Sequence, residues 1–582
     1  MTNIPRSEHP RPDRHRDSWI CLNGKWDFEI DNALVGEAKK FFERDRLDGE
    51  IVVPFCPESR LSGVAHTDFM NAVWYRRDLP IPADWAGKNV ILHIDASDYE
   101  TTVYVNGKKV GTHRGGYTSF QYDITKYLAA DGNYVTICAK DDIRGEKQVS
   151  GKQSHRFGSY GCYYTRTTGI WQTVWLEAVE AAHVTAYKVF SNISNSSVAL
   201  DVLTSNASVG AELSIKAYYE GKLMGEASAT VASSSTTVNI ALAEKHLWEC
   251  GNGRLYDLKF ELTKDGKTDV MDGYFGLREV ALTRDKGLMI NGKTVFGRFV
   301  LDQGFNPEGI ITAPDDKHLI FDIEASMACG FNGARLHQKV FEPRFLYHAD
   351  RLGYMVWGET GNWGLDHTLS DAIYNFLPEW LEEVERDFSH PSVIGWCPTN
   401  ETWDKHGRQQ FNPFLDSIYD ITKAIDKTRP VITSSGSYPT ERTDVHDVHD
   451  YEQDPVKLRS YYAEIDKGIV RDQIQRSSPN RQISKTHLPI FVSEYGGIGW
   501  VVKEDATAWG YGKSVEGEDD FFARLEGLTD VLLENKDIFG YCYTQLTDVE
   551  QEQNGLLTYD RQFKFDPARY HRIFAKKAAI ED

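Results

Sequence analysis

Residues 488–497 read LPIFVSEYGG, an apolar run of strand length that leads into a glutamate and then into two glycines. A run as apolar as Ile490 to Val492 is typical of a strand that is buried on both faces of a parallel sheet. The carboxylate at its end, Glu494, is either a solvated group at an element terminus or a group that a rigid strand holds for chemistry. The rest of the sequence decides between the two.

Segments of the same kind follow one another after Gly276, where apolar runs begin to alternate with amphipathic helices. This rhythm predicts a parallel sheet, and eight such strands within residues 279–582 match the size of a (β/α)8 TIM barrel. The candidates read, in order, TVFGRFVLDQ, GFNGARLHQ, GYMVWGETG, VIGWCPTNET, PVITSSGS, TDVHDVHDY, LPIFVSEYGG and IFGYCYTQLTD. In one intervening helix we expect Pro378 in the first turn and Trp380, Leu381, Val384 and Phe388 on one face.

Two all-β domains are predicted ahead of the barrel. Residues 1–178 form short alternating segments separated by turns, with a hairpin signal at Asn106-Gly107, which predicts a jelly-roll sandwich. Residues 179–278 continue as strands and have the size of an immunoglobulin-like β-sandwich, without the cysteine pair of true immunoglobulins. We therefore expect a multidomain protein with domains at 1–178, 179–278 and 279–582.

The composition argues against several classes of partner. The formal net charge of −21 disfavours nucleic acid, whose binding depends on Lys and Arg neutralising phosphates. The N-terminus lacks the apolar core of a signal peptide, and no run of about 18 apolar residues occurs, so we expect a soluble, cytoplasmic protein that does not bind membranes. The eight cysteines show no CxxC spacing, which predicts neither a zinc site nor a disulfide framework.

Polar residues stand at the ends of most of the predicted barrel strands, where the active site of such a barrel lies. They are Asp302-Gln303, Arg335, His337, Glu359, Asn400-Glu401, the segment 447–451, Glu494-Tyr495, Tyr543 and Gln545. Carboxylates that converge on one rim raise one another's pKa, and carboxylates with separated pKa values give an enzyme an acid and a nucleophile. Two carboxylates on either side of an acetal carbon suffice for glycoside hydrolysis, with retention at a separation of about 5 Å and inversion at roughly 6.5–9.5 Å. Glu401 and Glu494 are the preferred pair, because each follows a hydrophobic run and stands beside a small or polar residue. Catalytic pairs that include Glu359 stay open.

A second interpretation concerns the histidines and aspartates of the sixth candidate strand. His446 and His449, with Asp444, Asp447 and Asp450, include the residue types of a transition-metal site. In this architecture such a cluster more often contacts sugar hydroxyls, so we predict no metal ion and no other cofactor.

Two stretches resemble the active-site motifs of glycoside hydrolase family 2, the family of β-galactosidases, β-glucuronidases and β-mannosidases. They are GWCPTNETW at 395–403 and FVSEYG at 491–496. The stretch TGIWQTVWL at 168–176 looks like the end of that family's jelly-roll domain. The resemblance covers nearly the whole chain and implies a sugar-binding-like jelly roll, an immunoglobulin-like sandwich and a catalytic barrel.

The resemblance implies a retaining mechanism, in which Glu401 is the acid/base and Glu494 is the nucleophile. Asn400 would bind the sugar hydroxyl next to the anomeric carbon, and Tyr451 would approach the nucleophile. The other residues expected to contact the substrate are Asp302, Arg335, His337, Lys339, Glu359, Trp403, His449, Tyr543 and Gln545. Residues 158–164, GSYGCYY, are the predicted loop by which the jelly roll reaches the rim of the site.

Departures from the family's pattern bear on the substrate. The chain has Val300-Leu301-Asp302-Gln303 where many members carry Asn-x-His-Glu, and Arg335-Leu336-His337-Gln338-Lys339 where Arg-x-Ser-His-Tyr is common. The Asn-x-Lys motif of β-glucuronidases is missing from the acidic loop 550–557, although Lys339 could still pair a uronate.

We therefore expect an exo-glycosidase that acts on a terminal β-D-galactoside. An α-L-arabinosidase and a β-glucuronidase or galacturonidase are the alternatives within the family, and a catalytically silent carbohydrate-binding protein is the alternative outside it. Independent polysaccharide binding by the N-terminal sandwich, through Trp74, Tyr75, Tyr117 and Phe120, is a further possibility. The substrate is a small or oligosaccharide glycoside, and the resemblance leaves a homo-oligomer open.

Overall fold

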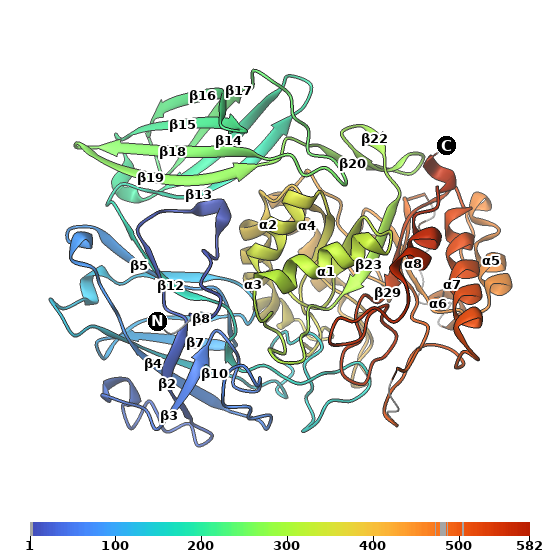
Figure 1. The fold of residues 1–582 in the computed structure, drawn as a ribbon, viewed down its shortest axis with the longest axis horizontal. Coiled ribbons are helices and arrows are strands. Elements are labelled where there is room, and N and C mark those ends of the chain that lie inside the picture. Colours follow the sequence, from blue (N-terminus) through green and yellow to red (C-terminus); the bar gives the residue numbers. More distant parts are fainter. Residues whose placement is uncertain (1–3, 472, 478–484, 486, 503–505, 582) are drawn as a thin grey trace.

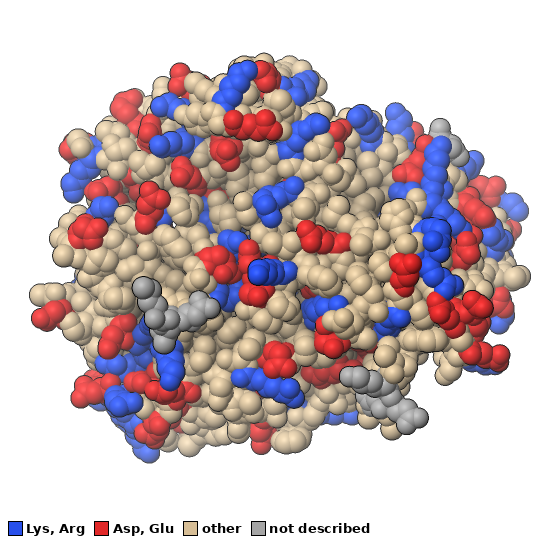
Figure 2. Space-filling view, viewed as in Figure 1, with Lys and Arg blue, Asp and Glu red and all other residues tan. Residues whose placement is uncertain are grey.

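Three packed parts make up the protein (Figure 1), in a computed structural model that describes residues 4–471, 473–477, 485, 487–502 and 506–581. Two β-sandwiches lie beside a parallel barrel with helices around it. Basic and acidic side chains are interspersed over the face shown in Figure 2. Among the described residues, no helix has both the length and the apolar character that crossing a bilayer requires.

The first sandwich consists of two antiparallel sheets, ordered β1-β12-β5-β9 and β3-β2-β4-β10-β7-β8, and of the short pair β6 and β11. Its strands are β1 (Trp19–Cys21), β2 (Gly24–Ile30), β3 (Gly49–Val53), β4 (Ala72–Asp78), β5 (Asn89–Ile94), β6 (Ser97–Asp98), β7 (Glu100–Val105), β8 (Lys108–Arg114), β9 (Phe120–Asp123), β10 (Tyr134–Lys140), β11 (Gly169–Ile170) and β12 (Val174–Val179). The predicted hairpin is confirmed: β7 and β8 pair around Asn106-Gly107, which both have positive φ.

Aromatic residues of this sandwich serve its core. Trp74, Tyr75 and Tyr117 are 1%, 0% and 1% exposed, and Phe120 stacks on His113 at 4.2 Å between ring centroids. Trp74, Tyr75 and Tyr117 therefore have no face free for stacking on polysaccharide, and the proposed sugar-binding role of these three rings was wrong.

The second sandwich has sheets ordered β13-β14-β17 and β16-β15-β18-β19. Its strands are β13 (Val184–Asn192), β14 (Ser197–Thr204), β15 (Glu212–Tyr219), β16 (Lys222–Thr230), β17 (Ser235–Ala241), β18 (Tyr256–Lys264) and β19 (Lys267–Phe275). Alternate residues such as Leu258, Phe260 and Leu262 of β18 are buried, as expected of a strand with one face in a core. A small sheet of β20 (Val280–Thr283), β21 (Gly287–Ile290) and β22 (Lys293–Thr294) leads into the barrel.

The barrel sheet is parallel throughout and has the order β26-β25-β24-β23-β29-β28-β27. Its strands are β23 (Gly297–Asp302), β24 (Gly333–Leu336), β25 (Met355–Glu359), β26 (Val393–Cys397), β27 (His446–Asp450), β28 (Ile490–Gly496) and β29 (Ile538–Thr544). The helices are α1 (Asp316–Ala328), α2 (Pro343–Leu352), α3 (Ala372–Asp387), α4 (Asn412–Ile425), α5 (Pro455–Tyr462), α6 (Gln473–Ser477), α7 (Glu518–Leu533) and α8 (Pro567–Phe574).

One of the eight predicted strands does not form as a strand. The fifth candidate, PVITSSGS at 430–437, forms two isolated bridges, from Val431 to Trp396 of β26 and from Ser435 to Asn400 just after it. Its serines and its glycine disfavour a regular ladder, but the backbone bonds Ile432 N to Trp396 O (2.9 Å) and Ser435 N to Thr399 O (2.9 Å) still hold it beside β26. The polar sixth candidate, in contrast, is the regular strand β27.

The predicted start of the third helix was wrong. Helix α3 begins at Ala372, so Pro378 lies inside it rather than in its first turn. Phe376, Trp380 and Val384 are buried on its inner face, and this packing outweighs the backbone hydrogen bond that a proline cannot donate.

Along each barrel strand, residues that face the interior alternate with residues that face the helices. Phe299, Trp357, Phe491 and Phe539 belong to one interior cluster, and ring contacts such as Phe491 to Phe539 at 5.3 Å link them. Trp248, from the second sandwich, joins this cluster, and its Nε1 donates to Asp350 O at 2.8 Å. The second sandwich therefore supplies part of the barrel's core.

Replacing Trp248 with alanine should destabilise the protein by about 3–5 kcal/mol, because the residue is fully buried and its removal leaves a cavity in the core. Thermal unfolding followed by circular dichroism measures the loss. The matched control is Val270→Ala in the same sandwich, where the side chain is 41% exposed. Equal melting temperatures for the two variants would contradict the interdomain core.

Candidate active site

Glu494 stands at the carboxyl end of β28, with its carboxylate inside the mouth of the barrel. It is 4% exposed, and its side-chain partners lie on or directly after two other strands, β24 and β27. Its Oε1 accepts from Arg335 Nη1 at 3.2 Å, and its Oε2 accepts from the Tyr451 hydroxyl at 2.5 Å. That hydroxyl also lies 3.0 Å from Thr544 Oγ1. Strand β28, formed within the stretch LPIFVSEYGG, therefore carries a buried and fixed carboxylate near its end.

Arg335, at 0% exposure, organises this end of the barrel from β24. Its guanidinium donates to Glu359 Oε2 at 2.7 Å, to Asn400 Oδ1 at 2.9 Å and to Ser493 O at 2.8 Å, besides Glu494. A planar group with five N–H donors suits such a fork of acceptors. One buried cation thus contacts side chains on β25 and β28 and the side chain of Asn400, which follows β26.

Neighbouring side chains keep two carboxylates of the site ionised. Burial alone would raise the pKa of Glu494, but His449, His337 and Arg335 lower it from 4.5 to about 2. Burial likewise opposes ionisation of Glu359, but Arg335 and His337 lower its pKa from 4.5 to about 2. Both groups are therefore anionic at neutral pH, and Glu494 is an ionised nucleophile candidate.

Glu401 follows β26 at a residue with φ +47°, an uncommon conformation for a non-glycine residue. Its backbone N–H donates to Ser435 O at 2.8 Å, which fixes it beside the irregular fifth segment. His449 Nδ1 lies 2.8 Å from Glu401 Oε1 and 3.3 Å from Glu494 Oε2, while His449 Nε2 lies 2.9 Å from Ser435 Oγ. The imidazole therefore touches both glutamates.

One oxygen of Glu401, one oxygen of Glu494 and a ring nitrogen of His449 all lie within 4.8 Å of one another. Burial alone would lower the pKa of His449, but the two carboxylates raise it above 6.5. The short separation of the carboxylates leaves no room for the water that an inverting mechanism places between them. This geometry fits a nucleophile and an acid/base on one bond.

Asn400 offers a donor to a ligand. Its Oδ1 is bound by Arg335, whereas its Nδ2 is buried and has no hydrogen-bond partner among the described residues. The backbone of Asn400 is held by the side chain of Asn362. Asn362 Oδ1 accepts from Asn400 N at 2.8 Å, and Asn362 Nδ2 donates to Asn400 O at 2.9 Å. A buried orphan amide beside two glutamates suits a substrate hydroxyl.

The structure brings together Arg335, His337, Glu359, Asn400, Glu401, His449, Tyr451 and Glu494 from the predicted set. Trp403, 42% exposed, stands at the rim. Gln545 adjoins the site through Gln303, whose Nε2 donates to Gln545 Oε1 and to the Tyr164 hydroxyl.

Three predicted residues face away from this group. Tyr543 packs against Phe574 of α8 at 5.4 Å between ring centroids, because it alternates with the interior residues Cys542 and Thr544. Asp302 similarly falls outside the interior register of β23, and burial beside Asp322 raises its pKa to about 7. Lys339 Nζ donates to Gly304 O and Ile311 O, both at 2.7 Å, which engages it away from the glutamates.

The N-terminal sandwich contributes Lys152, which was not predicted, and Tyr164, the last residue of the predicted rim loop. Lys152 is 6% exposed, and its Nζ lies 3.9 Å from Glu552 Oε2 and 5.4 Å from the centroid of the Trp363 ring. The Tyr164 hydroxyl donates to Glu552 Oε2 at 2.5 Å. Burial alone would lower the pKa of Lys152, but Glu552, Glu494 and Glu401 raise it above 10.5. A buried, charged ammonium therefore shares the field of the two catalytic candidates.

The predicted loop of residues 158–164 does reach the rim. Gly161 O accepts from Trp509 Nε1 at 2.8 Å and from Gln551 Nε2 at 2.6 Å, and both donors belong to the barrel. Lys152 lies shortly before this loop in the sequence, but nothing in the spacing showed that this lysine, rather than Lys339, faces the site.

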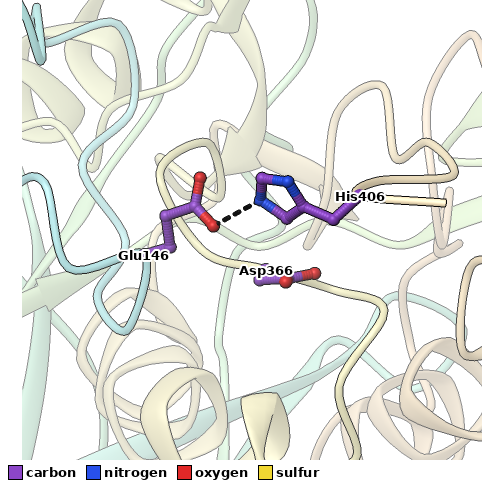
Figure 3. Close-up of side chains that lie close together, drawn as sticks. All are labelled: Glu146, Asp366 and His406. Atoms are coloured by element: carbon purple, nitrogen blue, oxygen red, sulfur yellow. Dashed lines mark hydrogen bonds and ion pairs between the residues drawn. The ribbon is translucent and has the colours of Figure 1, made fainter. Parts of the chain in front are cut away.

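A second cluster joins the same two domains (Figure 3). Glu146 of the first sandwich lies 2.8 Å from His406 Nε2, with Asp366 beside them. These three residues could offer ligand atoms to a metal, but Lys405 pairs with Glu146 at 3.0 Å and Arg408 pairs with Asp366. With both carboxylates already neutralised, the donor set fits an ion-pair clamp on the loop that follows Glu401.

Comparison with known proteins places the chain among glycosidases. Three family models match in succession: the sugar binding domain of glycosyl hydrolases family 2 at residues 20–174, a further domain of glycosyl hydrolases family 2 at 180–278, and its TIM barrel domain at 281–500. The β-galactosidase of Thermoanaerobacter pseudethanolicus is 26% identical over 411 residues, 66% of this chain. The β-glucuronidase of Paenibacillus borealis is 24% identical over 519 residues, 82% of each chain.

The chain spans 51% of the length of that β-galactosidase and 44% of a Formosa agariphila protein described as a putative β-glucuronidase. Among solved structures, a Lactobacillus rhamnosus β-glucuronidase superposes with a TM-score of 0.78 at 19% identity, over 97% of this chain and 98% of that one. At this identity the likeness shows the shared fold.

The buried carboxylates make stability depend on pH. Because Glu359 has a pKa of about 2 in the folded protein and 4.5 normally, its stabilising contribution is complete above pH 4.5 and is lost as the pH falls toward 2. Glu359→Gln leaves Arg335 short of a partner and should cost about 3–5 kcal/mol at pH 7. Melting temperatures of the two proteins should converge as the pH falls below 4.5. A difference that stays constant from pH 7 to pH 3.5 would contradict the assigned ionisation.

Proposed function

The chain belongs to glycoside hydrolase family 2, a family of retaining O-glycosyl hydrolases, and from that premise we propose that it removes a terminal β-linked uronic acid from its substrates. The observation that carries this choice of sugar is Lys152, whose buried ammonium lies 3.9 Å from Glu552 Oε2 and whose charge is favoured by the two catalytic candidates. The mechanism and the choice of sugar depend on different residues.

In the proposed mechanism, a carboxylate oxygen of Glu494 attacks the anomeric carbon while Glu401 gives its proton to the leaving oxygen. The glycosidic C–O bond breaks, and the sugar remains covalently attached to Glu494. Glu401 then removes a proton from water, which displaces Glu494 and releases the sugar with its original configuration. Arg335, His449 and the Tyr451 hydroxyl keep Glu494 ionised before attack and stabilise it as the leaving group in the second step.

The uronide proposal depends on where Lys152 lies. In β-glucuronidases of this family the loop after the last barrel strand carries the lysine for the substrate carboxylate, and here that loop carries Glu552 instead. Lys152 Nζ lies 3.9 Å from Glu552, so a cation from the N-terminal sandwich occupies the neighbourhood of the missing lysine. Lys152 would bind the uronate carboxylate, and Glu552 would accept a bond from a sugar hydroxyl.

Two further observations support a uronide. The Paenibacillus borealis relative, which matches over 82% of both chains, is a β-glucuronidase. Solved relatives include a Ruminococcus gnavus β-glucuronidase in complex with uronic inhibitors. The sequence had favoured a β-galactoside mainly because the Asn-x-Lys motif was missing. Lys152 offers another cation for a uronate carboxylate, so the missing motif no longer argues against a uronide.

A β-galactoside is the second candidate because of Glu552. This carboxylate is 1% exposed and already accepts from Tyr164, so it would repel a uronate if Lys152 did not neutralise it. With a neutral sugar, Glu552 and Lys152 would both bind hydroxyls. Thermoanaerobacter β-galactosidase, at 26% identity, is consistent with that choice.

Substitution of Lys152 distinguishes the two sugars. If the substrate is a uronide, Lys152→Met should lower kcat/KM on the preferred nitrophenyl β-D-glucuronide or β-D-galacturonide by about 30-fold or more, since a charge-assisted hydrogen bond is lost. On nitrophenyl β-D-galactoside the same variant should change less than about fivefold. Lys339→Met is the matched control, because its ammonium is engaged by two backbone carbonyls. A wild-type preference for the galactoside would refute the uronide proposal.

Substitution of the two glutamates tests the mechanism. Glu494→Gln should lower kcat by about four orders of magnitude or more on every glycoside, because no covalent intermediate can form. Glu401→Gln should lose about a thousandfold on leaving groups that need protonation but less on activated nitrophenyl glycosides. Azide should then raise the turnover of Glu401→Gln and give a β-glycosyl azide, seen by NMR. Full activity in either variant would contradict these roles.

A further inference from the structure

An aromatic strip runs outward from the catalytic pair, formed by Trp363, Tyr163 and Tyr160. The Tyr163 ring lies 5.3 Å from that of Trp363 and is tilted by 39°, and the Tyr160 ring stacks on Tyr163 at 5.1 Å and 21°. All three rings are partly exposed, unlike the buried aromatics of the sandwich cores. Partly exposed rings in a row, contributed by two domains, form a surface that a ligand could cover.

The strip begins beside the acid/base. Trp363 Nε1 donates to Asn400 O at 3.1 Å, so the indole is fixed against the residue that precedes Glu401. Burial raises the pKa of Tyr163, and Cys162, Tyr160 and Glu401 add to this, so the phenol shares the field of Glu401. In a retaining glycosidase the acid/base stands at the leaving oxygen, and the space beyond it holds the leaving group.

We propose that the aromatic strip binds the leaving group and that this group is itself a pyranose, so that the substrate is an oligosaccharide with at least one sugar stacked on Trp363 and Tyr163. This inference rests on the proposed function of the site. One face of a pyranose presents C–H groups that pack on an aromatic ring, whereas a flexible alkyl group gains little from a flat surface.

The strip is rigid, which is what a binding subsite requires. Tyr160 and Tyr163 close a turn by two backbone hydrogen bonds of 2.9 and 2.8 Å. Gly161 O between them is held by Trp509 and Gln551 of the barrel. His155 contacts both rings edge-on, at 5.5 and 5.4 Å. The rings are thus in place before a ligand arrives, and little ordering is needed on binding.

The end of the strip has polar groups for the outer sugar. The Arg156 guanidinium lies 3.8 Å above the centroid of the Tyr160 ring, and the Tyr160 hydroxyl lies 2.9 Å from His155 Nε2. On the other loop, Trp403 is two residues after Glu401 and packs on Tyr438 at 5.5 Å. Hydroxyl or anionic substituents on an outer sugar would find donors at Arg156 and His155.

The test separates the leaving group from the sugar that is cleaved. Wild type, Tyr163→Ala and Tyr160→Ala are compared on the β-glycosyl fluorides of glucuronic acid, galacturonic acid and galactose, whose leaving group has no ring. They are then compared on nitrophenyl glycosides and on disaccharides of the same sugars. We expect kcat/KM on the disaccharide to fall by about tenfold in Tyr163→Ala and by less in Tyr160→Ala, with the fluoride within about twofold of wild type.

Phe157→Ala provides the matched control, since this ring is on the same loop and is 68% exposed. It should leave all three kinds of substrate unchanged. An equal loss on fluoride and disaccharide, or no loss on either, would overturn the leaving-group role of the strip while leaving the proposed function intact. A loss on nitrophenyl glycosides but not on disaccharides would overturn the assignment of a sugar leaving group in favour of an aromatic one. No turnover of any fluoride by wild type would refute the proposed function, and the strip's role with it.

Discussion

A single buried guanidinium holds the catalytic end of the barrel together. Arg335 is fully enclosed and binds side chains of β25 and β28 and the side chain of Asn400 after β26, so its charge must be balanced within the barrel. Glu359 supplies most of that balance from below, which leaves Glu494 held but available for attack. The irregular segment 430–437 and His449 then position Glu401 on the other side of the bond to be cleaved. Arg335, Glu359 and Glu494 thus form one buried set of charges that fixes this end of the barrel.

The first sandwich, which is distant from the barrel strands in sequence, contributes side chains to the site. Tyr164 and Glu552 are 388 residues apart, yet they share a hydrogen bond of 2.5 Å, and Lys152 lies beside them. The ion pairs of Glu146 with Lys405 and His406 join the same sandwich to the loop after Glu401. Under the proposed function, specificity for the sugar and for the leaving group depends largely on contacts where the first sandwich meets the barrel, while the two catalytic candidates lie inside the barrel.

The sequence predicted what depends on local pattern. Apolar runs that lead into Glu401 and Glu494 indicate two buried strands and the pair of catalytic candidates, because a few consecutive residues show both the apolar strand and the carboxylate. It failed where the result depends on register or on distant contacts. Asp302 and Tyr543 stand one position out of phase with the interior, Lys339 is engaged by backbone carbonyls, and Pro378 is tolerated inside α3 by the packing around it. Lys152 enters the site from another domain, and no spacing in the sequence predicts its contact with Glu552 of the barrel.

The account depends most on Glu494 being the nucleophile. A 2-deoxy-2-fluoro glycosyl fluoride of the preferred sugar slows both steps by destabilising the oxocarbenium-like transition state, so the covalent intermediate accumulates. Proteolysis and mass spectrometry of the inactivated protein then locate the fluorosugar. The account predicts one fluorosugar per chain, on the peptide that contains Glu494, and no labelling of Glu494→Gln. A label on Glu359 or Glu401, or an active protein that none of the fluorosugars inactivates, would contradict it.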